Sequence, residues 1–329
     1  MKRLAAAVAT GTLLSVVLLT TTPAQATFSG QNGRIVFAMD RGNGQQIYTI
    51  RPNGTDRHRV THVDGTASSP SWSPDGSKIA FELDRPDDTS GIELMNADGS
   101  NLVDITPPKF KHGGIGQPSF TPNGRRIVFA GQACGRCIEA IWSVNLLGGD
   151  LRTILAARHL YKKSPRVSPD GRTVVFVVEK HIRNENGLDV NRKSLWTVKM
   201  DGTHLTEVVP FSFDVSTVGG DWAPGGKRIV FSNNAGYAGQ TVFTEPQNIF
   251  TVRPDGTGLK QLTHYRGLPP DLVTAARSYS PDGHWIMFRH FRDGIHTLWK
   301  MHPDGSHLTR IVRSKFLFSG YAAWGPRRK

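Results

Sequence analysis

The chain has 329 residues, of which 38% are hydrophobic and 9% aromatic, an ordinary globular balance that argues against disorder. Its 35 Gly and 20 Pro are spread along the whole chain, which disfavours bundles of long helices and predicts many short elements. The formal net charge of +13 favours anionic partners without naming one.

Residues 1–26 have the pattern of a secretory signal peptide. Lys2 and Arg3 precede an uncharged, mostly apolar run, and Ala24-Gln25-Ala26 has the small-x-small form that signal peptidase accepts. The alternative, an amino-terminal membrane anchor, needs roughly 20 apolar residues, whereas this run has about 17 and contains Thr and Gly. We therefore expect cleavage after Ala26 and a secreted or extracytoplasmic chain with a charge of +11 and no membrane span.

Two short sequence lines recur along the rest of the chain. The first joins an aromatic or aliphatic residue, a Pro-Asp-Gly-like turn and an Ile-Val-Phe-like run, in copies that begin at Trp72, Phe120, Val167, Trp222 and Tyr279. The second resembles Ile-Trp-Thr-Val-x-x-Asp-Gly, in copies that begin at Ile47, Ile92, Ile141, Leu195, Ile249 and Leu298. Repeats at this spacing indicate a solenoid, propeller or array.

Each repeat predicts a four-stranded antiparallel meander. In Ser-Pro-Asp-Gly, the proline presets φ, the aspartate bonds its own backbone and the glycine supplies a positive φ, which together make a hairpin turn. The segments on either side of this turn, the second recurring line and a segment such as Leu262-Thr263 are short and β-prone. They supply four strands per repeat.

The two ends of the chain together complete one further repeat. Successive closing phenylalanines, from Phe37 to Phe288, lie 44 to 57 residues apart, the length of a four-stranded propeller blade. The chain opens with a half motif at Asn32 and ends with the missing half at Tyr321 to Pro326. We predict an all-β, six-bladed β-propeller of four-stranded antiparallel blades, a single domain over residues 27–329, closed by pairing of the carboxy-terminal strand with the amino-terminal blade. The alternative, an open array of hairpins, leaves the half motif unexplained.

These lines resemble the repeats of the TolB-like six-bladed β-propellers, a WD-repeat-like group marked by Pro-Asp-Gly turns. The resemblance covers about residues 30 to 326 and implies the fold more than an activity. It does not include the α/β domain that precedes the propeller in TolB, for which we find no counterpart. Oligogalacturonate lyases and the propellers of prolyl-oligopeptidase-like peptidases belong to the same broad group, and the peptidases need a hydrolase domain for which there is no room.

In such a meander, the longer and more variable connections share one face of the ring. The Pro-Asp-Gly and Asp-Gly turns on the other face are too short to build a pocket, so we place the binding surface on the long-loop face, around the channel mouth. The alternative is that these loops only seal the ring. The loops span residues 107–117, 131–139, 156–164, 180–193, 210–219, 233–247 and 264–277.

Aromatic and basic residues interleave on these loops, which suits an anionic or sugar-like polymer or an acidic protein patch. The candidate binding residues are Lys111, His112, His159, Tyr161, Lys162, Lys163, Tyr237, His264, Tyr265, Arg266 and Arg277. A metal held by three of the histidines at positions 62, 112, 159 and 264 is implied only by the resemblance to the lyases. Their spacing follows the blades and forms no compact ligand motif, so we expect neither a metal nor another cofactor.

Two charged residues break the repeat pattern just before the aromatic residue of the first strand. Most copies carry a small residue there, but two adjacent blades carry Arg166 and Asp221. Matching positions near the axis predict an ion pair between blades, with a ligand contact as the alternative. Both residues therefore join the candidate list.

Cys134 and Cys137 are the only cysteines of the sequence and are separated by two residues. In a loop of an exported propeller, we interpret them as a short local disulfide. A free pair of thiols and half of a metal site are the alternatives.

We expect a monomeric, non-enzymatic recognition or scaffold module that binds a protein or an anionic envelope polymer, such as a polysaccharide, through its long-loop face. The alternative is a polysaccharide lyase or hydrolase with its site at the channel mouth; a purely structural or assembly role is a third. An enzyme needs titratable groups that converge within hydrogen-bond reach, and these loops contain few carboxylates. Nucleic acid is not an expected partner of an exported chain.

Overall fold

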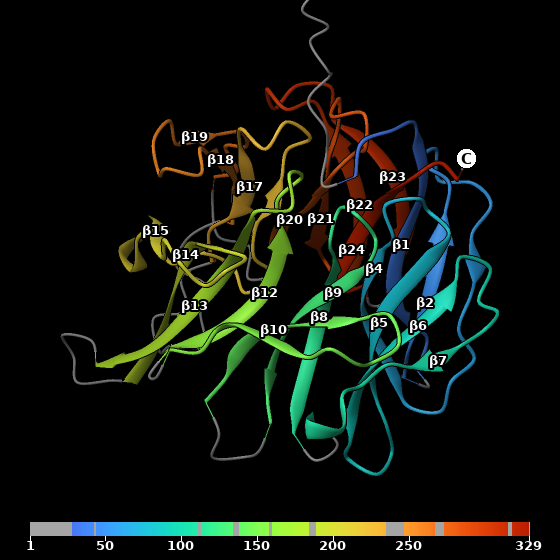
Figure 1. Ribbon diagram of the computed structural model, residues 1–329. Coiled ribbons are helices and arrows are strands. Elements are labelled where there is room, and N and C mark those ends of the chain that lie inside the picture. The colour runs from blue at the N-terminus through green and yellow to red at the C-terminus, as the bar shows by residue number, and fades with distance from the viewer. Residues whose placement is uncertain are drawn as a thin grey trace, which may run out of the picture.

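The computed structural model describes residues 28–42, 44–110, 113–133, 138–157, 160–183, 189–234, 247–266, 273–314 and 318–328. In these ranges, six four-stranded antiparallel sheets form the blades of a ring (Figure 1), as the repeats predict. Two 3₁₀ helices, η1 (Pro108–Phe110) and η2 (Phe211–Phe213), lie in the connections. None of the helices described is long and apolar enough to cross a membrane. The expected signal peptide and its cleavage site lie outside these ranges.

Blade 1 combines both ends of the chain, and each later blade takes the next four strands in order. Blades 1 to 3 consist of β24 (Phe318–Pro326), β1 (Asn32–Asp40), β2 (Gln45–Ile50) and β3 (His58–Arg59); β4 (Thr66–Trp72), β5 (Lys78–Asp84), β6 (Ser90–Asn96) and β7 (Val103–Asp104); and β8 (Gly114–Phe120), β9 (Arg126–Gln132), β10 (Ala140–Asn145) and β11 (Arg152–Leu155). Blades 4 to 6 consist of β12 (Tyr161–Val167), β13 (Thr173–Arg183), β14 (Asp189–Lys199) and β15 (Thr206–Val209); β16 (Asp221–Trp222), β17 (Ile229–Ser232), β18 (Ile249–Val252) and β19 (Lys260–Gln261); and β20 (Val273–Tyr279), β21 (Ile286–Arg292), β22 (Ile295–Met301) and β23 (Thr309–Ser314).

The ring is closed by main-chain pairing between the last strand and the first. Strand β24 runs antiparallel to β1, with Ile35 opposite Trp324 and Phe37 opposite Ala322. The first strands of adjacent blades contact one another around the axis, and β24 takes the place of a first strand between β4 and β20. The predicted closure is therefore confirmed, and it removes the free edges that an open array would expose.

The apolar core consists of interfaces between blades. Each of the six clusters found among the described residues combines side chains from two adjacent blades. Successive residues of a strand point to opposite faces, so Phe81 packs toward blade 1 and Ala80 toward blade 3. Because both faces of a blade are covered, the second strands are continuous apolar runs rather than alternating ones.

Several of the segments expected as long loops contain more strand than predicted; Tyr161, Lys162 and Lys163, for example, lie in β12. Strands β13 and β14 pair as far as Arg183 opposite Asp189, and their hairpin projects from the ring at the lower left of Figure 1. Strand β20 begins at Val273, so Arg277 lies in the first strand of blade 6 and not in a loop. The prediction that Arg277 lies on a long loop is therefore wrong. Arg277 lies in an inner strand and lines a pocket on the axis of the ring.

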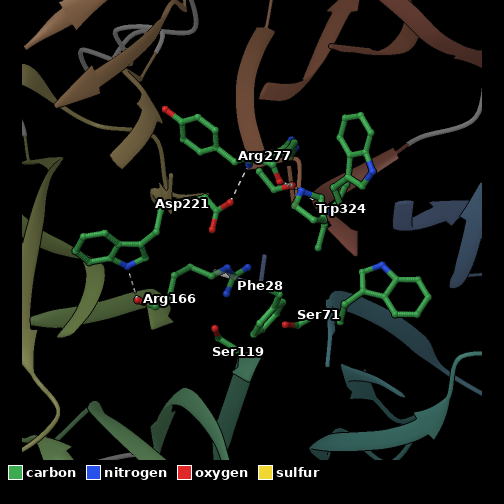
Figure 2. A pocket seen from close by; sticks show the side chains of 14 residues that line it. Phe28, Ser71, Ser119, Arg166, Asp221, Arg277 and Trp324 are labelled. Carbon is green, nitrogen blue, oxygen red and sulfur yellow. Dashed lines mark hydrogen bonds between the residues drawn. The ribbon is translucent and has the colours of Figure 1, made fainter. Parts of the chain in front are cut away.

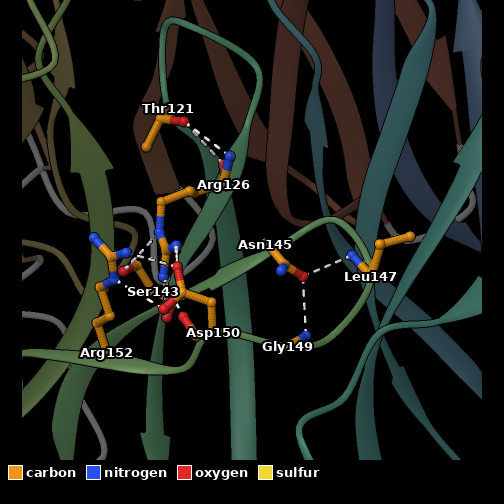
Figure 3. Close-up of polar contacts among 8 residues, drawn as sticks. All are labelled: Thr121, Arg126, Ser143, Asn145, Leu147, Gly149, Asp150 and Arg152. Atoms are coloured by element: carbon orange, nitrogen blue, oxygen red, sulfur yellow. Dashed lines mark hydrogen bonds and ion pairs between the residues drawn. The ribbon is translucent and has the colours of Figure 1, made fainter.

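Part of the positive charge stabilises individual blades. Arg126 on β9 donates to the Ser143 carbonyl of β10 at 3.0 Å and to the Asp150 carboxylate at 2.5 Å (Figure 3). Arg34 of blade 1 and Arg228 of blade 5 occupy the same repeat position and bind the same two neighbouring segments. These arginines stabilise the third strand and the turn after it, so they are not free to bind an anion.

A fully buried lysine fixes the connection between blades 3 and 4. The Lys162 ammonium donates to the carbonyl oxygens of Glu139, Ala157 and Leu160 at 2.8, 2.7 and 2.6 Å. Burial lowers the pKa of Lys162 to about 8, and the charge of Glu139 opposes that effect. The sequence suggested Lys162 as a ligand contact, but the structure uses all three of its donors internally.

Removal of β24 is expected to abolish the cooperative unfolding transition of the ring, because it exposes β1 and opens the interfaces on both sides of blade 1. The test is thermal unfolding, followed by near-ultraviolet circular dichroism, of a chain that ends at Ser314. A synthetic peptide of residues 318–329, added in trans, should restore the transition. A chain shortened only by Lys329 is the control, and a cooperative transition at the same temperature in the Ser314 chain would contradict the closure argument.

Lys162→Met is expected to lower the free energy of unfolding by about 2–4 kcal/mol, because three buried carbonyl groups lose their donor. Lys163→Met, at the adjacent position, breaks only a partly exposed 3.2 Å ion pair with Glu179 and should cost less than about 1 kcal/mol. Urea unfolding of both variants measures the difference. Equal losses would show that the three carbonyl bonds do not stabilise the blade connection.

Candidate functional site

The central channel ends in a narrow pocket on the side of the Pro-Asp-Gly turns, which we call the turn-end pocket. The same repeat position of each first strand points into it, and the six residues there are Ser71, Ser119, Arg166, Asp221, Ser278 and Ala323. Phe28, Trp72, Arg277 and Trp324 complete much of its wall (Figure 2), and its cavity volume is about 40 Å³. Sequence analysis expected no pocket on this side because the turns are short. The ends of the inner strands, together with Phe28, build it instead.

The two residues that break the repeat pattern lie in this pocket. Figure 2 shows the side chains of Arg166 and Asp221 directed toward the same space from adjacent blades. Burial lowers the pKa of Arg166, and the charge of Asp221 opposes that effect. Asp221 is 9% exposed and accepts the backbone N–H of Tyr279 at 2.9 Å, a bond between blades 5 and 6. The Asp221 carboxylate therefore has a structural role, and its charge attracts the Arg166 guanidinium.

Arg277 is the most unusual group of the pocket. Its side chain is 7% exposed, yet among the described residues neither Nη1 nor Nη2 has a hydrogen-bond partner. Burial lowers the pKa of Arg277 well below its ordinary value, and the charge of Arg289 lowers it further. An unpaired guanidinium in such a place destabilises the fold, and a group of this kind in a native structure points to a function or to an unseen partner.

Two indole groups add further unused donors to the wall. Trp72 and Trp324 each bury their Nε1–H without a partner in the described part of the chain. Both line the pocket, at 4% and 5% exposure. Sequence analysis identified these residues only as strand positions, because a repeat pattern does not show whether a buried N–H finds an acceptor. With Arg277, they bring to four the nitrogen atoms of pocket-lining residues that have no acceptor in the described ranges.

Below the pocket, Tyr321 crosses the channel. It comes from blade 1, and its hydroxyl lies 3.0 Å from Oγ of Ser164 in blade 4, on the opposite side of the ring. The Ser164 hydroxyl also donates to the Thr217 carbonyl, and the Ser164 backbone N–H donates to Gln117 Oε1. These bonds join blades 1, 3, 4 and the start of blade 5 in one layer.

Glu82 lies in the same region, between blades 2 and 3. Its carboxylate accepts the Gln117 N–H at 3.1 Å and packs against Gly116, where a Cβ atom would come within 2.3 Å of Oε2. Burial, together with the nearby charge of Asp84, raises the pKa of Glu82 to about 7. Neither Glu82 nor the crossing role of Tyr321 could be predicted from the sequence, because both depend on contacts between different blades.

The residues predicted on the long-loop face do not form a site with the residues of the pocket. Tyr161 is 47% exposed and its ring lies against His181, with centroids 5.4 Å apart. His264 and Arg266 are exposed, whereas Tyr265 is half-buried against His290. Of the candidate binding residues, the structure brings together Arg166, Asp221 and Arg277, and all three line the pocket at the turn end.

Several sequence predictions fall outside the described residues. These are Lys111, His112, His159, Tyr237 and the proposed disulfide between Cys134 and Cys137. Within the ranges that the structure describes, no group of three or more His, Cys, Asp or Glu side chains is placed to hold a metal ion. His62 and His264, the two described members of the suggested histidine set, are both exposed.

Known proteins share both the sequence pattern and the fold. The TolB beta propeller domain family, PD40, matches residues 53–242. The Tol-Pal system protein TolB of Francisella tularensis subsp. mediasiatica is 35% identical over 220 residues, which cover 53% of this chain and 50% of that protein. The chain thus spans about half the length of the curated relatives it matches.

Solved structures extend the likeness to nearly the whole chain. TolB from Acinetobacter baumannii has a TM-score of 0.65 and 18% identity, covering 90% of this chain and 67% of that one. Kuenenia stuttgartiensis hydrazine synthase has a TM-score of 0.68 and 15% identity, covering 94% and 51%. At these identities the likeness shows the fold alone. Since the family match spans more than half of the sequence, the chain belongs to the TolB beta propeller domain family.

Proposed function

We propose that this protein is an extracytoplasmic binding propeller that recognises a segment of a protein partner at the turn-end mouth of its channel. The observation that carries the proposal is the turn-end pocket, whose lining residues Arg277, Trp72 and Trp324 bury donors that find no acceptor among the described residues. Such groups are costly in the free protein and become satisfied when a ligand supplies the acceptors.

Two further observations support an extracytoplasmic protein partner. The curated relative at 35% identity is a Tol-Pal system protein, and its name places it in a system of several proteins. The first 26 residues of this chain have the pattern of a signal peptide, for which we propose cleavage after Ala26. The mature chain then begins one residue before Phe28, at the wall of the pocket.

The substitution Ala323→Phe should fill the turn-end pocket without straining the backbone. Ala323 occupies the repeat position at which blades 4 and 5 already carry the larger Arg166 and Asp221, so a long side chain enters the channel from this position. We expect the variant to lose at least tenfold in partner recovery when mature protein is used for affinity capture from an envelope fraction of the source organism. A melting temperature within a few degrees of that of the wild type confirms folding.

The matched control lies at the other end of the channel. Tyr161→Ala and His264→Ala alter exposed residues of the long-loop face and should leave partner recovery unchanged. Loss of recovery with these variants, and not with Ala323→Phe, would move the binding surface to the long-loop face. Capture at low and moderate salt separates a protein ligand from an anionic polymer, because polymer retention should fall steeply with salt.

A further inference from the structure

We propose that the turn-end pocket is a subsite for a carboxylate group, with Arg277 as its principal donor and the Trp72 and Trp324 indoles as its second and third. The inference rests on the proposed function only in naming the carrier of that group, an extended peptide segment of the partner. The recognition chemistry itself follows from the groups in the pocket wall.

The donors of the pocket call for an anion. Arg277 buries two guanidinium nitrogen atoms, and Trp72 and Trp324 bury one indole nitrogen each, all without acceptors in the described structure. Asp221, the carboxylate in the wall, already accepts the Tyr279 N–H and attracts Arg166. Two arginines and one aspartate leave the pocket with a net positive charge, so an entering anion is attracted and a cation is not.

The size of the pocket selects a small planar anion. Its volume of about 40 Å³ holds roughly three water-sized groups, since one water needs about 10–15 Å³. A carboxylate has three heavy atoms, whereas a sulfate or phosphate has five. The fork of a guanidinium also matches the two oxygens of a carboxylate, which makes the contact bidentate.

Access to the subsite is from the turn end. Tyr321 crosses the channel on the inner side, where its hydroxyl contacts Ser164. Phe28 also lines the pocket (Figure 2). A peptide therefore enters past Phe28 with its carboxylate leading, and its chain remains outside the ring.

The first test is titration of the mature protein with acetate, observed through the indole N–H signals of its seven tryptophans. Two of these signals, from Trp72 and Trp324, should shift with acetate and stay in place with acetamide, its neutral analogue. Arg277→Met should weaken the apparent affinity at least tenfold. The control, Arg292→Met, removes the same charge at the exposed far end of β21 and should bind acetate like the wild type.

Stability distinguishes a binding role of Arg277 from a structural one. Arg277→Met removes a buried unpaired charge, so its melting temperature should rise above that of the wild type. A fall in melting temperature would indicate a structural arginine and would overturn the assignment. Unchanged acetate affinity in this variant, or equal shifts with chloride, would overturn it as well.

Short peptides identify the carrier. A tripeptide with a free carboxy terminus should shift the two indole signals, and its amidated form should not. Binding of acetate without binding of the free-carboxylate peptide would overturn the peptide carrier. Partner capture without acetate binding would refute the subsite alone, and acetate binding without any captured partner would refute the proposed function alone.

Discussion

Every feature of this protein depends on the pairing of its last strand with its first. The main-chain bonds between β24 and β1 turn a row of six sheets into a ring, and only in a ring do the first strands face a common axis. The two apolar clusters that include blade 1 contain side chains from both ends of the chain, Trp324 and Ile35 in one and Ala323 and Val36 in the other. Closure therefore creates the core of blade 1 and the channel in one step.

The ring could be predicted because its elements are repeated, whereas its site could be predicted only in part. One recurring line has five copies and the other has six, so the strand pattern of a blade does not depend on any single segment. The half motifs at the two ends predict that the last strand pairs with the first blade. Arg166 and Asp221 were found because they break the repeat at a single position. Arg277 breaks the repeat one position earlier, where the other copies carry Pro, Gly or Ala. Because residues 264–277 are predicted as a loop, this position does not stand out as part of a strand.

The rest of the site has no signal in a single sequence. Trp72 and Trp324 match the repeat, and only the folded ring shows that their indole nitrogens have no acceptor within the part of the chain that the structure describes. Tyr321 contacts Ser164 across the channel, and these two residues are 157 positions apart in the sequence. Lys162 is the opposite case. The sequence suggests a ligand contact, because this basic residue follows an aromatic one, but its three ammonium donors bind backbone carbonyl groups of the protein itself. Residue type indicates what a side chain is able to bind, and burial decides whether it is free to do so.

The crossing of the channel by Tyr321 separates the two ends of the molecule. Its bond to Ser164 belongs to a layer that also includes Gln117 and Thr217, so the pocket at the turn end has a floor made of hydrogen-bonded groups from four blades. Such a floor is held by rigid strands, so the donors above it keep their positions without a ligand. Burial of the Arg277 guanidinium costs free energy of folding. The apolar packing of the six interfaces between blades offsets this cost. The proposed carboxylate subsite therefore needs no ordering of its donors when a ligand binds.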